Sequence, residues 1–215
     1  MKPPPKPAWN RGKVVGKKPP LTPDEVSLIR LLLRQDSRTQ PAAVRDLALF
    51  NVALDTCFRG SDLVRLRVAD VATPLGVREI VEIRQKKTES RNARPVQARL
   101  SAVTRDSLRV YLATQERPLH SWLFTGHGVR WSQKNHLSES QLWRLFKGWL
   151  VRARLDPALY GLHSLRRTFP TYIHQQTGNL RAAQLLLGHV SIESTKEYIG
   201  TEQAEALDIA RRYHL

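Results

Sequence analysis

The stretch GLHSLRRTFPTYIHQQTGNLRAAQLLLGHVSIESTKEYIG, residues 161–200, decides the fold of the C-terminal half. Its apolar residues recur at helical spacing, and the Gly188-His189 pair closes one of the helices. Pro170 lies inside the first helix and predicts a kink or a late helix start, because proline removes a backbone donor. The pattern therefore predicts three helices, at about 164–176, 180–187 and 191–199.

Several polar side chains in and before this stretch are candidates for one site. His163 and Arg166 are three residues apart and share a helix face. Tyr198 follows His189 by nine residues. Upstream, Arg59 and Gly60 form a helix-to-helix corner in TCFRGSDLVRLR, a position that can project a side chain.

A lysine completes the set. Lys87 lies at the expected turn of a hairpin in QKKTES, and its neighbour Lys86 is the alternative. Each residue of the set also has a purely structural interpretation when taken alone. Tyr198 is then a packed aromatic, His163 and His189 are helix caps, and Arg59 pairs with Asp62 three residues on.

Taken together, these residue types suit a phosphodiester. Arginine forks match phosphate oxygens and stabilise the charge that develops as phosphorus becomes five-coordinate. A tyrosine hydroxyl can act as a covalent nucleophile if positive groups or a base lower its barrier to deprotonation. Histidine can supply that base, and a lysine can protonate the leaving oxygen. This chemistry needs no metal and no cofactor.

The rest of the chain predicts a mostly α protein with a small antiparallel β-sheet, an α+β fold in one domain over residues 21–215. Further helices are expected from Thr22-Pro23, at 42–56, after Gly60-Ser61, and at 104–116, 139–154 and 202–213. EIVEIRQ and RPVQARL alternate apolar and polar residues and predict a hairpin, as part of a small three-stranded sheet. Residues 1–20 hold six prolines and six Lys/Arg with no acid, which predicts a disordered basic tail.

The composition of the chain indicates its kind of partner and excludes several kinds of protein. The net charge of +16 favours a polyanionic partner, and nucleic acid is the commonest. One cysteine, Cys57, excludes a disulfide framework and a zinc site with several thiolates. No apolar run reaches the ~18–20 residues of a membrane span. We therefore expect a cytoplasmic protein that does not enter a membrane.

The order and spacing of TCFRGSDLVRLRVADV, the lysine hairpin, HSLRRT, LLLGH and STKEYI resemble the signature of the tyrosine recombinase (phage integrase) family. The resemblance implies the family's catalytic-domain fold and a site-specific recombinase that cleaves and rejoins DNA through a 3′-phosphotyrosyl intermediate. The residue roles that it implies are Tyr198 as nucleophile, Arg59 and Arg166 as phosphate clamps, His163 as general acid/base, His189 as phosphate ligand or positioning group, Lys87 as general acid and Asp62 as support.

The family also implies action at the bacterial nucleoid, or a gene carried by a phage or mobile element, and it implies partners. These are double-stranded DNA, other copies of the chain in a tetramer of paired dimers, and accessory DNA-bending or directionality proteins. The helix at 202–213 is expected to be exchanged with a neighbouring subunit. Few residues precede the first arginine helix, so the chain resembles the short fimbrial-switch recombinases. A non-cleaving DNA-binding regulator and a type IB topoisomerase are the alternatives.

Overall fold

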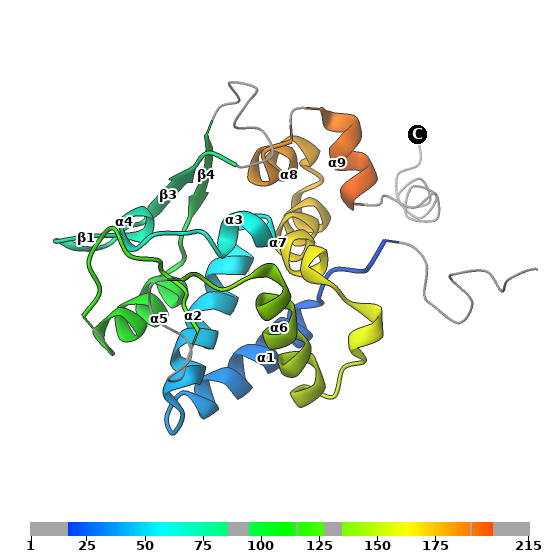
Figure 1. The fold of residues 1–215 in the computed structure, drawn as a ribbon. Helices are drawn as coiled ribbons and strands as arrows, with labels where there is room; N and C mark the ends of the chain where they lie inside the picture. Colours follow the sequence, from blue (N-terminus) through cyan, green and yellow to red (C-terminus); the bar gives the residue numbers. More distant parts are fainter. Residues whose placement is uncertain (1–16, 86–94, 115, 127–134, 190, 200–215) are drawn as a thin grey trace, which may run out of the picture.

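The computed structural model describes residues 17–85, 95–114, 116–126, 135–189 and 191–199. These residues form a mostly helical domain with small antiparallel sheets, as predicted (Figure 1). Its elements are α1 (Pro23–Asp36), α2 (Pro41–Thr56), α3 (Gly60–Leu63), α4 (Val68–Val71), β1 (Ala72–Thr73), β2 (Gly76–Val77), β3 (Ile80–Ile83), β4 (Val96–Arg99), α5 (Ala102–Ala113), α6 (Glu139–Arg152), η2 (Pro157–Leu159), α7 (Leu162–Thr177), α8 (Leu180–Leu187) and α9 (Ile192–Ile199).

Helix α2 is the centre of the core. It is buried almost all round, and it packs against α1, α5 and α7. Phe50 is fully buried and meets the ring of Trp149 from α6 edge to face, with ring centroids 5.7 Å apart. A helix that is apolar on nearly every face is stable only when other helices cover it. Helix α2 therefore fixes where α7 lies.

The first helix begins as its sequence predicts. The Thr22 hydroxyl accepts a hydrogen bond from the Glu25 amide, the Glu25 carboxylate accepts one from the Thr22 amide, and Pro23 occupies the first turn. Two orphan amides are thus satisfied reciprocally. The Tyr160 hydroxyl also contacts Glu25 at 2.7 Å, which ties this end of α1 to the segment before α7.

The sheet is smaller than expected. Strands β3 and β4 pair antiparallel with Val81 opposite Ala98, and β1 and β2 form a second pair. The hairpin prediction is confirmed, but the prediction of one three-stranded sheet is wrong for the described residues, which form two separate two-stranded sheets. In β4, Val96 and Ala98 are buried, so one face of the hairpin packs on the core.

The region after Gly60 also differs from its prediction. Instead of continuing as one helix, it breaks into α3 and α4 with a turn between them. Backbone pairing explains the break, because Leu123 N donates to Leu66 O at 2.8 Å and Val68 N donates to Ser121 O at 3.0 Å. These backbone groups are therefore not available for the hydrogen bonds of a continuous helix.

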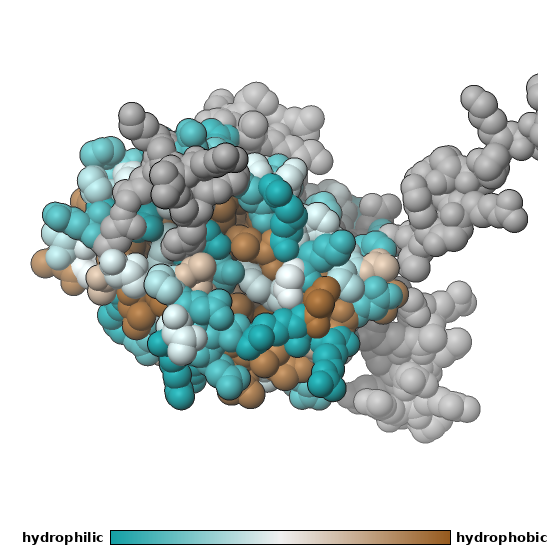
Figure 2. Space-filling model, turned by 60° about the horizontal axis from the view of Figure 1, so that its bottom comes forward, coloured by the Kyte–Doolittle hydropathy of each residue, from teal (hydrophilic) through white to brown (hydrophobic). Residues whose placement is uncertain are grey.

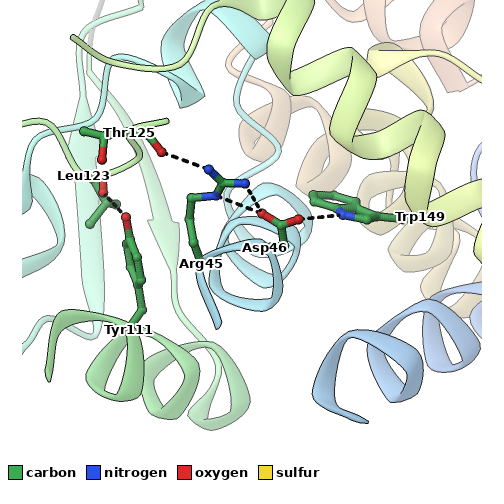
Figure 3. Close-up of polar contacts among 6 residues, drawn as sticks. All are labelled: Arg45, Asp46, Tyr111, Leu123, Thr125 and Trp149. Carbon is green, nitrogen blue, oxygen red and sulfur yellow. Dashed lines mark hydrogen bonds and ion pairs between the residues drawn. The ribbon is translucent and has the colours of Figure 1, made fainter. Parts of the chain in front are cut away.

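A buried ion pair joins α2 to its neighbours (Figure 3). The Arg45 guanidinium contacts the Asp46 carboxylate at 2.6 Å, and Trp149 Nε1 of α6 donates to the same carboxylate at 3.2 Å. Arg45 also donates to Thr125 O at 3.0 Å. Buried charges are costly unless their hydrogen bonds are made, and here both partners have several. The network connects α2, α6 and the segment around Thr125.

Helix α7 is continuous from Leu162 and contains Pro170. The helix starts before His163, so the prediction of a late start is wrong. The segment before α1 is tied to this helix: Arg167 donates to Lys18 O at 2.5 Å, and Leu21 N donates to Thr168 Oγ1 at 3.0 Å. The predicted disordered tail lies outside the described residues up to position 16, and the predicted helix at 202–213 lies outside them entirely.

The surface carries scattered apolar side chains. On the face shown in Figure 2, hydrophobic patches are separated by hydrophilic ones. Single exposed apolar residues of this kind are ordinary for a folded chain. Of the helices that the structure describes, none has the length and apolar character to cross a membrane.

Candidate active site

Arg59 projects from the corner between α2 and α3. Helix α2 ends at Cys57 in the left-handed conformation (φ 52°), and Arg59 then extends the backbone into α3. A methyl group on Gly60 would lie 3.1 Å from Leu162 Cδ1, so the corner packs closely against the start of α7. The Arg59 side chain is half-buried, and its Nη1 donates to Gln85 Oε1.

Helix α7 supplies His163 and Arg166. Ser164 Oγ accepts from Gly161 N at 3.1 Å and helps to start the helix. His163 lies on the first turn and is partly exposed, whereas Arg166, three residues on, is only 2% exposed. Arg166 Nη2 donates to Leu187 O at 2.6 Å. The position of this guanidinium is therefore fixed by the C-terminal end of α8.

The turn Leu187–His189 is the point at which the site elements meet. Gly188 adopts φ +63°, a conformation that favours glycine. A methyl group there would overlap Val96 Cγ2 and lie 3.2 Å from Gln85 Nε2. Absence of a side chain at Gly188 thus allows the end of α8 to lie against β4 and against the residue that binds Arg59.

His189 connects α8 to α9. Its backbone is held by a reciprocal pair of hydrogen bonds with Gln184, at 3.1 Å and 3.0 Å. Its ring Nδ1 lies 3.1 Å from Thr195 Oγ1, and Thr195 is buried in α9. Arg181 donates to Gln184 Oε1 at 2.7 Å, which holds the Gln184 amide in place. The ring orientation of His189 is therefore set by both helices.

Tyr198 belongs to α9, which packs against α8 and α7. It follows Thr195 by three residues, so the two positions share a helix face. The Tyr198 side chain lies outside the described part of the chain, as does all of Lys87 and of its alternative, Lys86. Asp62 is buried in α3 and lines a cavity of about 320 Å³ with Arg65 and Glu82 among others.

The arginine side chains of the site affect the pKa of His163. Partial burial lowers the pKa of His163, and Arg166, Arg167 and Arg59 lower it further, against a smaller opposing effect of Glu139. His163 is consequently neutral at pH 7 and can accept a proton. Burial also raises the pKa of the Cys57 thiol. Within the described ranges, no group of three or more His, Cys, Asp or Glu side chains could hold a metal ion.

The lowered pKa of His163 gives a pH prediction. As the pH falls, His163 takes up a proton in the unfolded chain before it does so in the folded chain. The stability that neutral His163 contributes is therefore lost below about pH 6.5, the ordinary pKa of histidine. We expect His163→Gln to lose less stability than the wild type between pH 7.5 and 5.5, measured by urea unfolding. The control is His120→Gln, which changes a histidine in the segment between α5 and α6, outside the site. Equal pH dependence in His163→Gln and the wild type would contradict the prediction.

The structure brings Arg59, His163, Arg166 and His189 to one place around the turn Leu187–His189. Sequence reasoning missed Gln85 and Thr195, which contact Arg59 and His189. A signal existed for Gln85, a polar residue at the end of an alternating strand. Thr195 carried none that separates it from an ordinary helix residue.

Comparisons with known proteins identify the family of the chain. Residues 20–205 match the phage integrase family. The chain is 24% identical over 188 residues to tyrosine recombinase XerD of Listeria innocua, covering 86% of this chain and 60% of that protein. It is 28% identical over 181 residues to tyrosine recombinase XerC of Erythrobacter litoralis, covering 84% and 54%. The chain thus spans less than two thirds of the length of these relatives.

Solved structures share the fold. The crystal structure of XerA recombinase aligns with a TM-score of 0.69 at 20% identity, covering all of this chain and 67% of that one. The catalytic domain of bacteriophage HP1 integrase aligns with a TM-score of 0.56 at 17% identity, covering 92% and 96%. XerH site-specific recombinase, solved bound to its difH substrate, aligns with a TM-score of 0.67 at 18% identity, covering 92% and 55%.

Proposed function

Since the chain belongs to the phage integrase family, we propose that it is a site-specific recombinase that cleaves and rejoins double-stranded DNA through a 3′-phosphotyrosyl intermediate. The observation that carries the proposal is the convergence of Arg59, Arg166 and a neutral His163 beside the turn that leads into the helix of Tyr198. Two guanidinium groups next to a proton acceptor suit an anionic phosphodiester better than any uncharged substrate.

The proposed reaction exchanges one phosphodiester for another. The Tyr198 oxygen attacks the phosphorus, and its proton passes to His163. The bond from phosphorus to the 5′ oxygen breaks, and the leaving oxygen takes a proton from Lys87. Because a phosphodiester of equal charge is formed, the reverse attack by a 5′-hydroxyl rejoins the strand without an energy cofactor.

The arginines act mainly through electrostatics in this proposal. A pentavalent transition state carries more negative charge on its non-bridging oxygens than the ground state does. The bond to Leu187 O fixes the Arg166 charge before DNA arrives, so little reorganisation is needed. Asp62, three residues after Arg59, supports this part of the site from α3.

The proposal extends to the assembly. We expect a tetramer of paired dimers on DNA in the cytoplasm, with accessory DNA-bending or directionality proteins, as in the short fimbrial-switch recombinases. In it, the segment 202–213 passes to a neighbouring subunit. The net charge of +16 supports the DNA part, because phosphate contacts by Lys and Arg dominate such affinity.

Trapping the intermediate tests the function. The protein is incubated with labelled duplexes from the regions around its own gene, each nicked next to the candidate cleavage position so that the released fragment diffuses away. A denaturing gel should show protein joined to the 3′ end of one strand. Tight, salt-sensitive binding without any covalent band would favour the regulator. Relaxation of a plasmid that lacks such sites would favour the topoisomerase.

A further inference from the structure

Gln85 combines deep burial with a place between the two arginines. It follows β3 by two residues and is only 2% exposed. Burying a primary amide is unfavourable unless its hydrogen bonds are made. An apolar residue would fill this position at the edge of the hairpin without that cost. The amide therefore calls for an explanation beyond packing.

Its first contact is with Arg59. Gln85 Oε1 accepts from Arg59 Nη1, on the guanidinium of a side chain that is otherwise half-exposed. A long arginine side chain at a surface corner loses much rotamer freedom when it is held in one geometry. One anchored nitrogen restricts the plane of the fork while the other donors can still bind phosphate oxygens.

The other end of its amide lies near the turn. Gln85 Nε2 lies 3.2 Å from the position that a methyl group on Gly188 would occupy. The residue before Gly188, Leu187, accepts from Arg166 through its carbonyl oxygen. Gln85 thus contacts Arg59 on one side and, on the other, lies beside the turn that fixes Arg166.

We propose that Gln85 is a positioning residue that orients the Arg59 guanidinium relative to Arg166, because it accepts from Arg59 and is buried beside the turn Leu187–His189 that fixes Arg166. A neutral amide suits this role, because it orients the guanidinium without cancelling its charge. A carboxylate at the same place would compete with the phosphate for Arg59. The inference rests on the proposed function for its catalytic meaning, but the contact between Gln85 and Arg59 can be tested without cleavage.

The test is a double-mutant cycle between Gln85→Met and Arg59→Met, in the full chain, with Gln97→Met as the control. Methionine keeps the size of the side chain and removes the acceptor. Gln97 lies on the exposed face of the same hairpin. The first readout is the NMR titration of the His163 ring, which faces Arg166, Arg167, Arg59 and Glu139. We expect Gln85→Met to raise the His163 midpoint, as Arg59→Met does, and to add nothing in the Arg59→Met background.

The second readout is the rate of covalent attachment to the nicked duplex. We expect Gln85→Met alone to lower this rate about 10-fold, because a small displacement of a group that binds the reacting phosphate slows the reaction. In the Arg59→Met background, the same substitution should lower the rate less than about twofold. Gln97→Met should match the wild type. An unchanged midpoint of the His163 titration in Gln85→Met would overturn the proposal. So would fold-changes in rate that multiply in the double variant, because the two residues would then act independently.

Two complications are covered by the design. If the wild type forms no covalent complex with any duplex, the proposed function fails, and the titration cycle alone decides the role of Gln85. If Gln85→Met does not fold, Gln85→Glu replaces it, since it keeps the size and the acceptor. We expect Gln85→Glu to fold and to bind and cleave the duplex more weakly than the wild type. Binding and cleavage equal to the wild type would overturn the proposal.

Discussion

Replacing Tyr198 with phenylalanine should abolish covalent attachment to DNA, a loss of at least about 10⁴-fold, because no other group can take over a nucleophile that has been deleted. The variant loses one oxygen and keeps the ring, so α9 should remain folded. Binding to the same duplex should stay within about twofold, since phosphate contacts by basic side chains carry most of the affinity. The measurement is the covalent band on a denaturing gel beside a binding titration.

Tyr172→Phe is the matched control for this substitution. Tyr172 is 40% exposed on α7 and belongs to none of the contacts that build the site. It should cleave as the wild type does. A covalent band that persists in Tyr198→Phe would show that another residue is the nucleophile and would sink the assignment of Tyr198.

The second large effect is expected at Gly188. Gly188→Ala should lower the free energy of unfolding by about 2–5 kcal/mol, combining left-handed backbone strain with overpacking against Val96. It should also lower covalent attachment, because any shift of the turn moves the carbonyl that holds Arg166 and the ring of His189. Urea unfolding and the trapping assay measure the two effects separately.

Gly178→Ala separates strain from contact. Gly178 ends α7 with φ +65°, nearly the angle of Gly188, but a methyl group there meets nothing within 4 Å. This variant should show the strain alone and keep its activity. If Gly188→Ala lowered the free energy of unfolding no more than Gly178→Ala does, close packing of the turn against the hairpin would contribute nothing to stability.

Much of the fold could be predicted because its signals are local. Thr22 and Pro23 mark the start of α1, and the alternation in EIVEIRQ marks a strand. The predicted boundaries of α8 agree with the structure. The break between α3 and α4 could not be predicted in this way, because it depends on backbone pairing with residues 121–123, far away in sequence.

Some residues of the candidate site could also be predicted from local sequence, and others could not. Arg59, His163, Arg166 and His189 were found because their types and order suit one chemistry. Gln85 was not found, because its importance comes from where its amide lies between Arg59 and Gly188 rather than from any motif. Long-range contacts of this kind need the folded chain. The catalytic roles of all these residues, and those of Lys87, Tyr198 and Asp62, stay predictions.

The single cysteine of the chain has a practical consequence. Cys57 is fully buried at the end of α2, and its thiol stays protonated because burial raises its pKa. Thiol reagents attack the thiolate, so the folded chain offers them no ready target. A cysteine introduced at an exposed position such as Val110 in α5 would then take a fluorophore selectively. Pairs of molecules labelled in this way could test the proposed assembly by reporting the distance between protomers in the presence of DNA.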